Sequence, residues 1–427
     1  MNDIVTPAGA RQAGRPAAVL ERANRRPVYL DNQSTTPLDP RVLDAMLPYF
    51  TEQFGNPHSE SHIYGKEAAA AVERAREDVA RLMGADLREI VFTSGATEAN
   101  NLALKGVAHF ARAHPQAGRP PRDGPRDRIV ILETEHKCVL ESASALGREG
   151  FAVISVPVEP HGLVSLDRLA GALDERTLIV SVMAAHNEIG VIQPLAEIGA
   201  LCRSRGVLFH TDAAQAFGKI PLDVEAMKLD LMSISGHKIY GPKGIGALYV
   251  RRRPRVRLEP LFDGGGQERG LRSGTLPTPL CVGLGRAASI AREEMDSEAA
   301  RLRGLRDRLQ AILIHRVPGL RVNGDTAHRL PGNLNLSFPG LTAPELIAAC
   351  PTVAMSTGSA CTSASVEPSY VLRALGLSDE LANASIRLGL GRFTSEEEVD
   401  FAADALTAAA SRLYSEHRVT DAQAVPT

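Results

Sequence analysis

The segment from Asp230 to Val250, which reads DLMSISGHKIYGPKGIGALYV, contains the residues with the clearest chemical potential. An apolar run at its start predicts a short buried strand, which should end at Ser235 and deliver His237 and Lys238 into a turn rich in glycine and proline. A lysine becomes nucleophilic when burial and cationic neighbours lower the pKa of its amine. Lys238 could then form a Schiff base with pyridoxal phosphate (PLP), with Ser235 and His237 as donors to the phosphate. The alternative is that Lys238 is an ordinary surface lysine.

Polar residues also follow two other predicted strands. His136 comes after the strand 128–133, just before a helix, and Asp212 and Gln215 come after the strand that begins at Val207. Ligands bind in doubly wound sheets at the carboxyl ends of the strands, so these side chains are candidates for one site. Asp212 could pair with the protonated nitrogen of a pyridine ring, and Gln215 could bond the ring oxygen. A metal site is disfavoured because the strand supplies no third ligand.

A glycine-containing turn at residues 94–97 precedes a predicted helix that runs from Glu98 to about Arg112. Such a turn presents backbone N–H groups at the positive end of the helix dipole, where phosphate binds well. The hydroxyl of Thr97 could add a side-chain donor to this site. The alternative is that Thr97 only caps its helix, with Glu98 in the first turn.

One of the five cysteines differs from the others in its surroundings. Cys361 lies in the segment Ser356–Ser365, which is almost entirely small or polar, and an exposed thiol on such a loop is a candidate for reactivity. We expect Cys202, Cys281 and Cys350 to be buried and inert. Cys138 stands beside His136, close to the predicted site, but it begins a helix and we assign it to packing. No two cysteines form a CxxC pair, which argues against a zinc site or a disulfide framework. Arg387 lies on a later predicted strand, where an inward guanidinium suits a bidentate contact with a carboxylate.

Strands and helices alternate up to Lys238, which predicts a mostly parallel sheet with helices on both faces. A long helical region from about Pro279 to His315 then leads to a C-terminal part in which shorter strands and helices alternate, as in a smaller α+β domain. The basic run at residues 251–253 is expected to be a solvated strand end. The predicted fold class is therefore α/β with a second, smaller domain.

The bulk properties disfavour several classes of function. The chain has 427 residues and a net charge of −2 with acidic and basic residues interspersed, so nothing favours binding to nucleic acid or to an anionic membrane. Its apolar runs are too short to span a bilayer. Unpaired cysteines favour a reducing compartment, and we expect a cytoplasmic protein. Residues 1–26 and 415–427 lack apolar periodicity, and we expect flexible tails there.

Together these motifs resemble those of the cysteine desulfurases of the IscS/NifS type, within the class V aminotransferase group of PLP enzymes. The resemblance covers about residues 27–413. The matching segments are Tyr29–Pro37, Phe54–His58, Val91–Glu98, Thr134–Val139, Asn187–Gly190, His210–Gln215, Ser233–Gly246, Gly264–Thr275, Ser356–Ser369 and Ser385–Phe393. The resemblance implies fold type I, with a seven-stranded, mainly parallel sheet in a large domain at residues 37–292. It also implies a small domain formed by residues 27–36 and 293–414, and a homodimer.

The resemblance also implies how the cofactor is held. Lys238 would carry PLP as a Schiff base, and His136 would stack on the ring and move protons. Asp212 would pair with the pyridine nitrogen, and Gln215 with the ring hydroxyl. The phosphate would be held by Ala96, Thr97, Ser235 and His237, together with Thr275 from the other subunit.

The activity implied by the resemblance is conversion of L-cysteine to L-alanine, with transfer of sulfur to a persulfide on Cys361. Asn187 and Arg387 would orient the carboxylate of the substrate. The sulfur would pass to an acceptor protein, such as an iron–sulfur scaffold or a sulfur carrier used in thiolation. The alternatives are a selenocysteine lyase or an aminotransferase of the same fold, or a partner-binding relative without activity. An aminotransferase has no use for Cys361, and a relative without activity has no need of Lys238 or Asp212.

Overall fold

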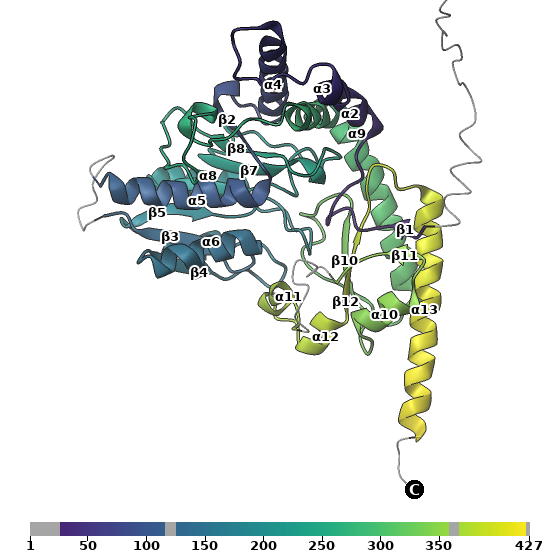
Figure 1. Cartoon of the computed structure of the whole chain (residues 1–427). Coiled ribbons are helices and arrows are strands. Elements are labelled where there is room, and N and C mark those ends of the chain that lie inside the picture. The colour runs from purple at the N-terminus through teal and green to yellow at the C-terminus, as the bar shows by residue number, and fades with distance from the viewer. Residues whose placement is uncertain (1–25, 116–124, 358–366, 424–427) are drawn as a thin grey trace, which may run out of the picture.

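A seven-stranded sheet forms the centre of the larger part of the molecule (Figure 1). The computed structural model describes residues 26–115, 125–357 and 367–423. The strands of the sheet are β2 (Ile90–Thr93), β3 (Arg128–Leu132), β4 (Ala152–Val156), β5 (Thr177–Ser181), β6 (Leu208–Asp212), β7 (Leu231–Ser235) and β8 (Gly246–Val250). They lie in the order β2-β8-β7-β6-β5-β3-β4, and within this sheet β8 is antiparallel to both neighbours whereas the other pairs are parallel. The mostly parallel sheet predicted from the sequence is confirmed.

Side chains along each strand alternate between two apolar layers, one on each face of the sheet. In β3, Ile129 and Ile131 pack under α5 (Ala96–Ala113) and α6 (Lys137–Arg148), whereas Val130 and Leu132 face the opposite layer. The helices of the opposite layer are α4 (Ile63–Leu82), α7 (Leu166–Ala172), α8 (Leu195–Arg205) and the first part of α9 (Thr278–Arg316). Helices therefore cover both faces, which is why every residue of β2, β5, β7 and β8 is buried.

A smaller sheet lies in the second part of the molecule, at the right of Figure 1. Its antiparallel strands are β9 (Arg321–Val322), β10 (Asn333–Ser337) and β12 (Ser385–Gly389), in the order β12-β10-β9. The N-terminal strand β1 (Val28–Tyr29) pairs with β11 (Val353–Ala354) beside it. The helices that pack on this sheet are α10 (Ala343–Ala349) and α13 (Glu396–Gln423). This part has its own apolar core, as expected for a smaller α+β unit. The short helices α11 (Tyr370–Ala374) and α12 (Asp379–Asn383) instead contribute Leu372 and Ala382 to the core of the large sheet.

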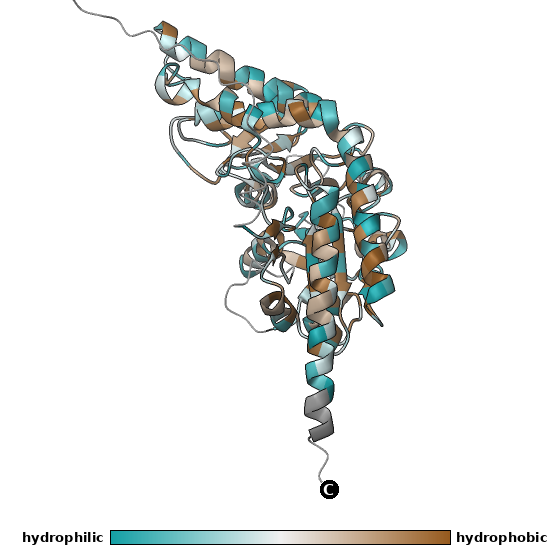
Figure 2. Cartoon of the chain, turned by 90° about the vertical axis from the view of Figure 1, so that its right-hand side faces the viewer, coloured by the Kyte–Doolittle hydropathy of each residue, from teal (hydrophilic) through white to brown (hydrophobic). Residues whose placement is uncertain are grey.

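The helix α9 joins the two parts of the molecule. Cys281 and Leu284 near its start belong to the core of the large sheet, whereas Leu305 and Leu313 belong to the core of the small one. Two short helices, α2 (Pro40–Met46) and α3 (Pro48–Thr51), pack against it near its start. Its second half lies beside α13, and Figure 2 shows both helices banded with apolar and polar residues, as suits helices with one buried side.

Two expectations from the sequence are wrong. The segment 415–423, predicted to be a flexible tail, continues α13 to Gln423, because its residues add helical turns to an already nucleated helix at little cost. Arg251, predicted to lie at a solvated strand end, is buried and donates hydrogen bonds to the carbonyl oxygens of Leu229 (2.7 Å) and Val224 (3.0 Å). The expected N-terminal tail lies almost wholly outside the described residues. Within those residues, none of the helices combines the length and the apolar composition that crossing a membrane requires.

Candidate active site

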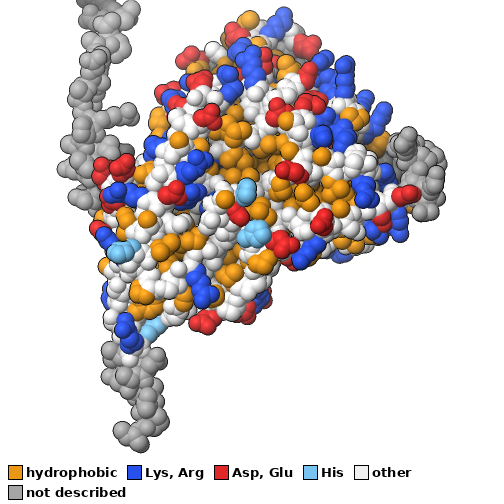
Figure 3. Space-filling view, turned by 180° about the vertical axis from the view of Figure 1, so that it is seen from behind, with side chains coloured by type: hydrophobic (Ala, Val, Ile, Leu, Met, Phe, Trp, Pro, Cys, Tyr) orange, Lys and Arg blue, Asp and Glu red, His pale blue; other side chains and the backbone are white. Residues whose placement is uncertain are grey.

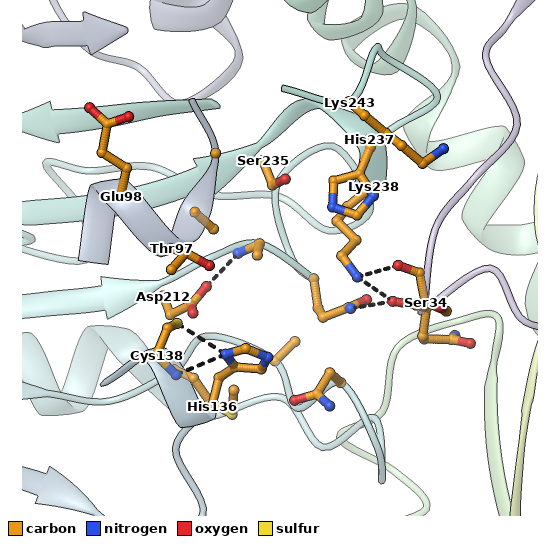
Figure 4. Close-up of a pocket in the computed structure, with 18 of the residues that line it drawn as sticks. Ser34, Thr97, Glu98, His136, Cys138, Asp212, Ser235, His237, Lys238 and Lys243 are labelled. Carbon is orange, nitrogen blue, oxygen red and sulfur yellow. Dashed lines mark hydrogen bonds between the residues drawn. The ribbon is translucent and has the colours of Figure 1, made fainter. Parts of the chain in front are cut away.

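A cavity of about 460 Å³ lies at the carboxyl edge of the large sheet (Figure 4). Its walls are the segments that follow β2, β3, β5, β6 and β7, together with β12 and the segment after β1 from the small part of the molecule. Ten of the residues singled out in the sequence line it, and they are Ala96, Thr97, His136, Asn187, Asp212, Gln215, Ser235, His237, Lys238 and Arg387. Strand ends that are distant in sequence therefore meet in one space, as the parallel topology requires.

Lys238 ends the short 3₁₀ turn Gly236–Lys238, directly after β7. Its Nζ donates hydrogen bonds to the main-chain carbonyl oxygens of Gln33 and Ser34, both at 2.6 Å (Figure 4). Gln33 and Ser34 follow β1, so the small part of the molecule positions the amine over the end of the large sheet. Neither residue was singled out from the sequence, although both lie in a segment that carries the family resemblance.

Asp212 is the last residue of β6 and is nearly fully buried. Its Oδ1 accepts a hydrogen bond from the backbone N–H of Ala214 (2.9 Å), and its Oδ2 accepts one from the side-chain amide of Asn100 (2.7 Å). The neighbouring Glu135 is buried as well, and burial followed by the charge of Asp212 raises the pKa of Glu135 well above its usual range. The surroundings of Glu135 therefore favour its protonated form.

His136 occupies the N-cap of α6, and its Nδ1 accepts a hydrogen bond from the backbone N–H of Cys138 (3.2 Å). The Sγ of Cys138 lies 3.0 Å from the same nitrogen and 3.0 Å from the amide nitrogen of Asn100. Cys138 also lines the cavity. Cys138 therefore lies close to the site, as its position beside His136 suggested, but its assignment to packing is wrong. The reason is its contact with Asn100, which comes from α5 and leaves no trace in the local sequence.

The amino end of α5 opens onto the cavity through Ala96 and Thr97. Its N-cap, Gly95, has φ 153° and ψ −180°, a conformation essentially restricted to glycine, and it provides no side-chain cap. The neighbouring strand β8 can pass close by because Gly246 lacks a side chain: a Cβ there would lie 2.7 Å from the Cα of Gly95. The first N–H groups of α5 thus remain available to an anion.

His237 and Arg387 approach the cavity from opposite parts of the molecule. Burial, with the nearby charge of Lys238 as the next cause, lowers the pKa of His237 to about 4, so its ring is neutral at pH 7. Its Nδ1 lies 3.0 Å from the hydroxyl of Thr35. Arg387, on β12, donates hydrogen bonds to the carbonyl oxygen of Asn187 (2.9 Å) and to a carboxylate oxygen of Asp31 (2.7 Å). The guanidinium is therefore held at the cavity wall before any ligand binds.

Two residues singled out in the sequence are not brought into this cavity. Thr275 is exposed and does not line it, and Cys361 lies outside the described residues. The cysteines that are fully buried are Cys202, Cys281 and Cys350, as predicted. Burial raises the pKa of Cys202 and of Cys281 to about 12, which keeps these thiols protonated and unreactive.

Comparison with known proteins identifies relatives of this chain. The profile of the family described as Aminotransferase class-V matches residues 28–401. The chain belongs to this class V aminotransferase family. A human protein named cysteine desulfurase is 58% identical over 376 residues, covering 88% of this chain and 80% of the relative. A Rickettsia felis protein named cysteine desulfurase IscS is 55% identical over 387 residues, covering 91% of this chain and 92% of the relative.

Solved structures agree with this family assignment. A NifS-like protein superposes with a TM-score of 0.82 at 38% identity, covering 90% of this chain and 99% of the other. A structure described as SspA in complex with cysteine has a TM-score of 0.74 at 37% identity, covering 86% of this chain and 99% of the other. As a class V member with such relatives, the chain is a cysteine desulfurase, and its cofactor is PLP.

The residues present in the cavity fit this cofactor. PLP carries an aldehyde, a basic ring nitrogen and a phosphate, and the cavity offers the Lys238 amine, the Asp212 carboxylate and the uncapped amino end of α5. Asp212 is fixed by two hydrogen bonds and Lys238 by two more, so both groups are held at the cavity wall before a cofactor binds.

Proposed function

We propose that this enzyme removes sulfur from L-cysteine and releases L-alanine, with Lys238 as the cofactor anchor and proton-transfer base. The observation that supports the assignment is that Lys238, Asp212, His136 and the amino end of α5 line one cavity. When bound, PLP withdraws electrons from the substrate and thereby labilises the bonds at its Cα. In this proposal Asp212 keeps the ring nitrogen protonated, and His136 lies against the ring and moves protons.

The phosphate and the substrate carboxylate are held by separate groups in this proposal. Ala96, Thr97, Ser235 and His237 bind the phosphate, while Gln215 bonds the ring hydroxyl. Asn187 and Arg387 orient the substrate carboxylate from the side of the small sheet. Because Arg387 is already anchored by Asp31 and by the carbonyl of Asn187, little conformational freedom has to be lost when the carboxylate binds.

The sulfur acceptor in this proposal is Cys361. Its thiolate attacks the sulfur of the substrate, an S–S bond forms, and the C–S bond breaks with its electron pair moving toward the substrate carbon. Protonation of that carbon then gives L-alanine, and the persulfide remains on Cys361. A selenocysteine lyase or an aminotransferase would not depend on this thiol in the same way.

We further propose a homodimer in which Thr275 reaches the phosphate of the other subunit. Thr275 is exposed and lies outside the cavity of its own chain. Large apolar side chains are exposed over α2, α3, the following segment and the start of α4, and they are Leu43, Leu47, Phe50, Phe54, Ile63 and Tyr64. Figure 3 shows apolar side chains gathered across the rear face. Such surfaces are typical of contacts with another chain.

The downstream acceptor is a protein of iron–sulfur cluster assembly or a sulfur carrier for thiolation, in a reducing compartment such as the cytoplasm. The four described cysteines are free thiols, which agrees with a reducing environment. Trapping the persulfide with labelled sulfur and identifying the proteins that receive the label would distinguish the two acceptor classes.

The activity is tested by comparing the wild-type enzyme with Lys238→Ala and Cys361→Ser. L-Cysteine should give equal amounts of L-alanine and transferable sulfur with the wild type. Lys238→Ala should lose alanine formation by several orders of magnitude, and Cys361→Ser should no longer form a protein persulfide. Unchanged alanine formation in Cys361→Ser would favour the aminotransferase-like alternative, and a preference for selenocysteine would favour the lyase.

A further inference from the structure

Asn100 is a fully buried amide with no role in the chemistry described above. It lies in the second turn of α5, behind the cavity wall. Its Nδ2 is 2.7 Å from Oδ2 of Asp212 and 3.0 Å from Sγ of Cys138, whereas its Oδ1 has no hydrogen-bond partner among the described residues. A carboxylate oxygen can only accept, so the contact with Asp212 identifies the nitrogen. This orientation of the Asn100 amide leaves its buried carbonyl oxygen unpaired, which is unfavourable. The two hydrogen bonds that the amide nitrogen donates offset this cost.

One of the two donated hydrogen bonds fixes the Asp212 carboxylate. Asp212 receives one donor on each oxygen, from Ala214 in the segment after β6 and from Asn100 in α5. Because the two donors come from different elements, they restrict rotation of the Asp212 carboxylate about its Cβ–Cγ bond. The plane of the carboxylate is therefore set by α5 as well as by its own strand.

The other hydrogen bond leads to His136 through a thiol. The Cys138 sulfur accepts from Asn100, which leaves its own hydrogen free to be donated to Nδ1 of His136 at 3.0 Å. The same nitrogen accepts the backbone N–H of Cys138 (3.2 Å), so it carries a lone pair and the ring proton of the neutral form resides on Nε2. The hydrogen bonds thus run in one direction, from Asn100 through Cys138 to His136.

We propose that Asn100 is a positioning residue for the reaction, because one amide fixes Asp212 directly and His136 through Cys138. The inference rests on the proposed function, in which these two residues contact the cofactor ring at its nitrogen and on its face. The amide of Asn100 then sets the position of the Asp212 carboxylate relative to the imidazole of His136. Glu135 lies close enough to Asp212 and His136 to interact with their charges, and His186 lies close enough to His136. Neither makes a hydrogen bond to Asn100 in the described residues.

The holoenzyme is tested with Asn100→Ala, Cys138→Ala, Cys138→Ser and the double alanine variant. For each, kcat and KM for L-cysteine, the visible absorbance of the bound cofactor and the rate of cofactor loss are measured. Asn100→Ala should lower kcat about 10- to 100-fold with KM within about twofold, and should shift the absorbance and speed cofactor loss. Cys138→Ala should show a smaller loss, and the double variant should lose no more than Asn100→Ala alone.

The conservative variant separates positioning from packing. A serine at position 138 can still accept from Asn100 and donate to His136, so Cys138→Ser should stay closer to the wild type than Cys138→Ala. Packing alone predicts the reverse, because serine replaces a half-buried apolar sulfur with a more polar hydroxyl group. Asn101→Ala is the matched control, because its amide, one position along α5, bonds only the carbonyl oxygen of Thr97 (2.9 Å) in the described residues. It should keep kcat, absorbance and cofactor retention within about twofold of the wild type.

The outcomes also separate this inference from the proposed function. Asp212→Ala should lose cofactor and activity if the proposed function holds. Dependence on Asp212 without any dependence on Asn100 would overturn the positioning role alone. If Asn100→Ala fails to fold, the Cys138 pair decides: equal kcat and absorbance in Cys138→Ala and Cys138→Ser overturns the inference, and recovery by serine supports it. Full activity and cofactor retention in Asp212→Ala would overturn the proposed function as well.

Discussion

Glu135 lies next to the cavity, and its buried surroundings favour the protonated form of its carboxyl group. One of its oxygens accepts the backbone N–H of Met183 (2.6 Å), and the other has no partner among the described residues. Burial and the adjacent Asp212 raise its pKa, so the folded protein holds a proton here that the unfolded chain releases above its ordinary pKa. This carboxyl group therefore lowers stability increasingly as the pH rises.

Replacing Glu135 with glutamine should remove this pH dependence, because the amide does not titrate. Between pH 5 and pH 8 the free energy of unfolding of the wild type should fall relative to that of Glu135→Gln, since the unfolded wild-type chain binds fewer protons than the folded one. Denaturant unfolding at both pH values measures the difference. Equal changes in the two proteins would contradict a raised pKa at Glu135.

The sequence identifies those site residues whose position is marked by the local pattern of their own segment. Lys238 and Asp212 follow apolar strands directly, so the rule that ligands bind at strand ends is enough to predict that they lie together. Asn100 and Gln33 could not be found this way. Their partners lie 112 and 205 positions away in the chain, and only the packing of α5 and the return of the N-terminal segment bring them together.

At the scale of elements, the loop that carries Thr275 is held by a buried ion pair. Arg76 of α4 makes two hydrogen bonds to Glu268, at 2.8 and 2.7 Å, and the backbone N–H of Phe92 in β2 donates to the same carboxylate at 2.7 Å. Glu268 adopts a positive φ of 49°, which is unfavourable for a non-glycine residue and is maintained by these contacts. A helix, a strand and a loop therefore meet at one carboxylate.

Removing only one partner of this pair should be severe. Arg76→Met leaves the Glu268 carboxylate buried without its cation, which should lower the free energy of unfolding by about 3–5 kcal/mol. The double variant Arg76→Met/Glu268→Gln should recover part of that loss, because no uncompensated charge remains. Thermal or urea unfolding gives both values. The exposed pair of Arg88 and Asp86 offers a control, and Arg88→Met should cause no measurable change.

Element type was more predictable than element length. The alternation of strands and helices predicted the parallel sheet, and α9 was expected within a residue of its ends. The end of α13 was not, because the polar residues after 414 have no apolar period of their own and become helical only by extending an existing helix. Arg251 was misjudged for a similar reason, since its carbonyl acceptors lie about 22 and 27 positions earlier in the chain.

At the scale of the whole molecule, two buried histidines couple folding to acidity. His186 accepts the backbone N–H of Glu188 (3.0 Å) and lies 2.8 Å from the carbonyl oxygen of Thr134, while His210 lies between the hydroxyls of two serines. Burial lowers the pKa of His186 to about 4 and that of His210 to about 3. Both stay neutral in the folded protein at a pH where the unfolded chain protonates them.

Acidification below the ordinary histidine pKa should therefore destabilise the fold. From about pH 6 to pH 5, each of these histidines should lower the free energy of unfolding by up to about 1.4 kcal/mol, because unfolding takes up one more proton per group. Glu135 and Glu188, whose pKa values burial raises, contribute in the opposite direction. The comparison therefore needs His210→Gln, whose slope against pH should be smaller by about one proton. Parallel slopes for this variant and the wild type in urea unfolding would rule the histidine out as a cause.

The helix α9 enters both apolar cores and has no proline after Pro279 to serve as a hinge. Because one continuous helix packs into both parts of the molecule, a large change in the angle between them would have to break main-chain hydrogen bonds within α9. The spacing between the Lys238 amine on one half and the Arg387 guanidinium on the other is consequently built in during folding. If Arg387 binds the substrate carboxylate as proposed, amino acids whose carboxylate lies at a different distance from the amino group should bind poorly.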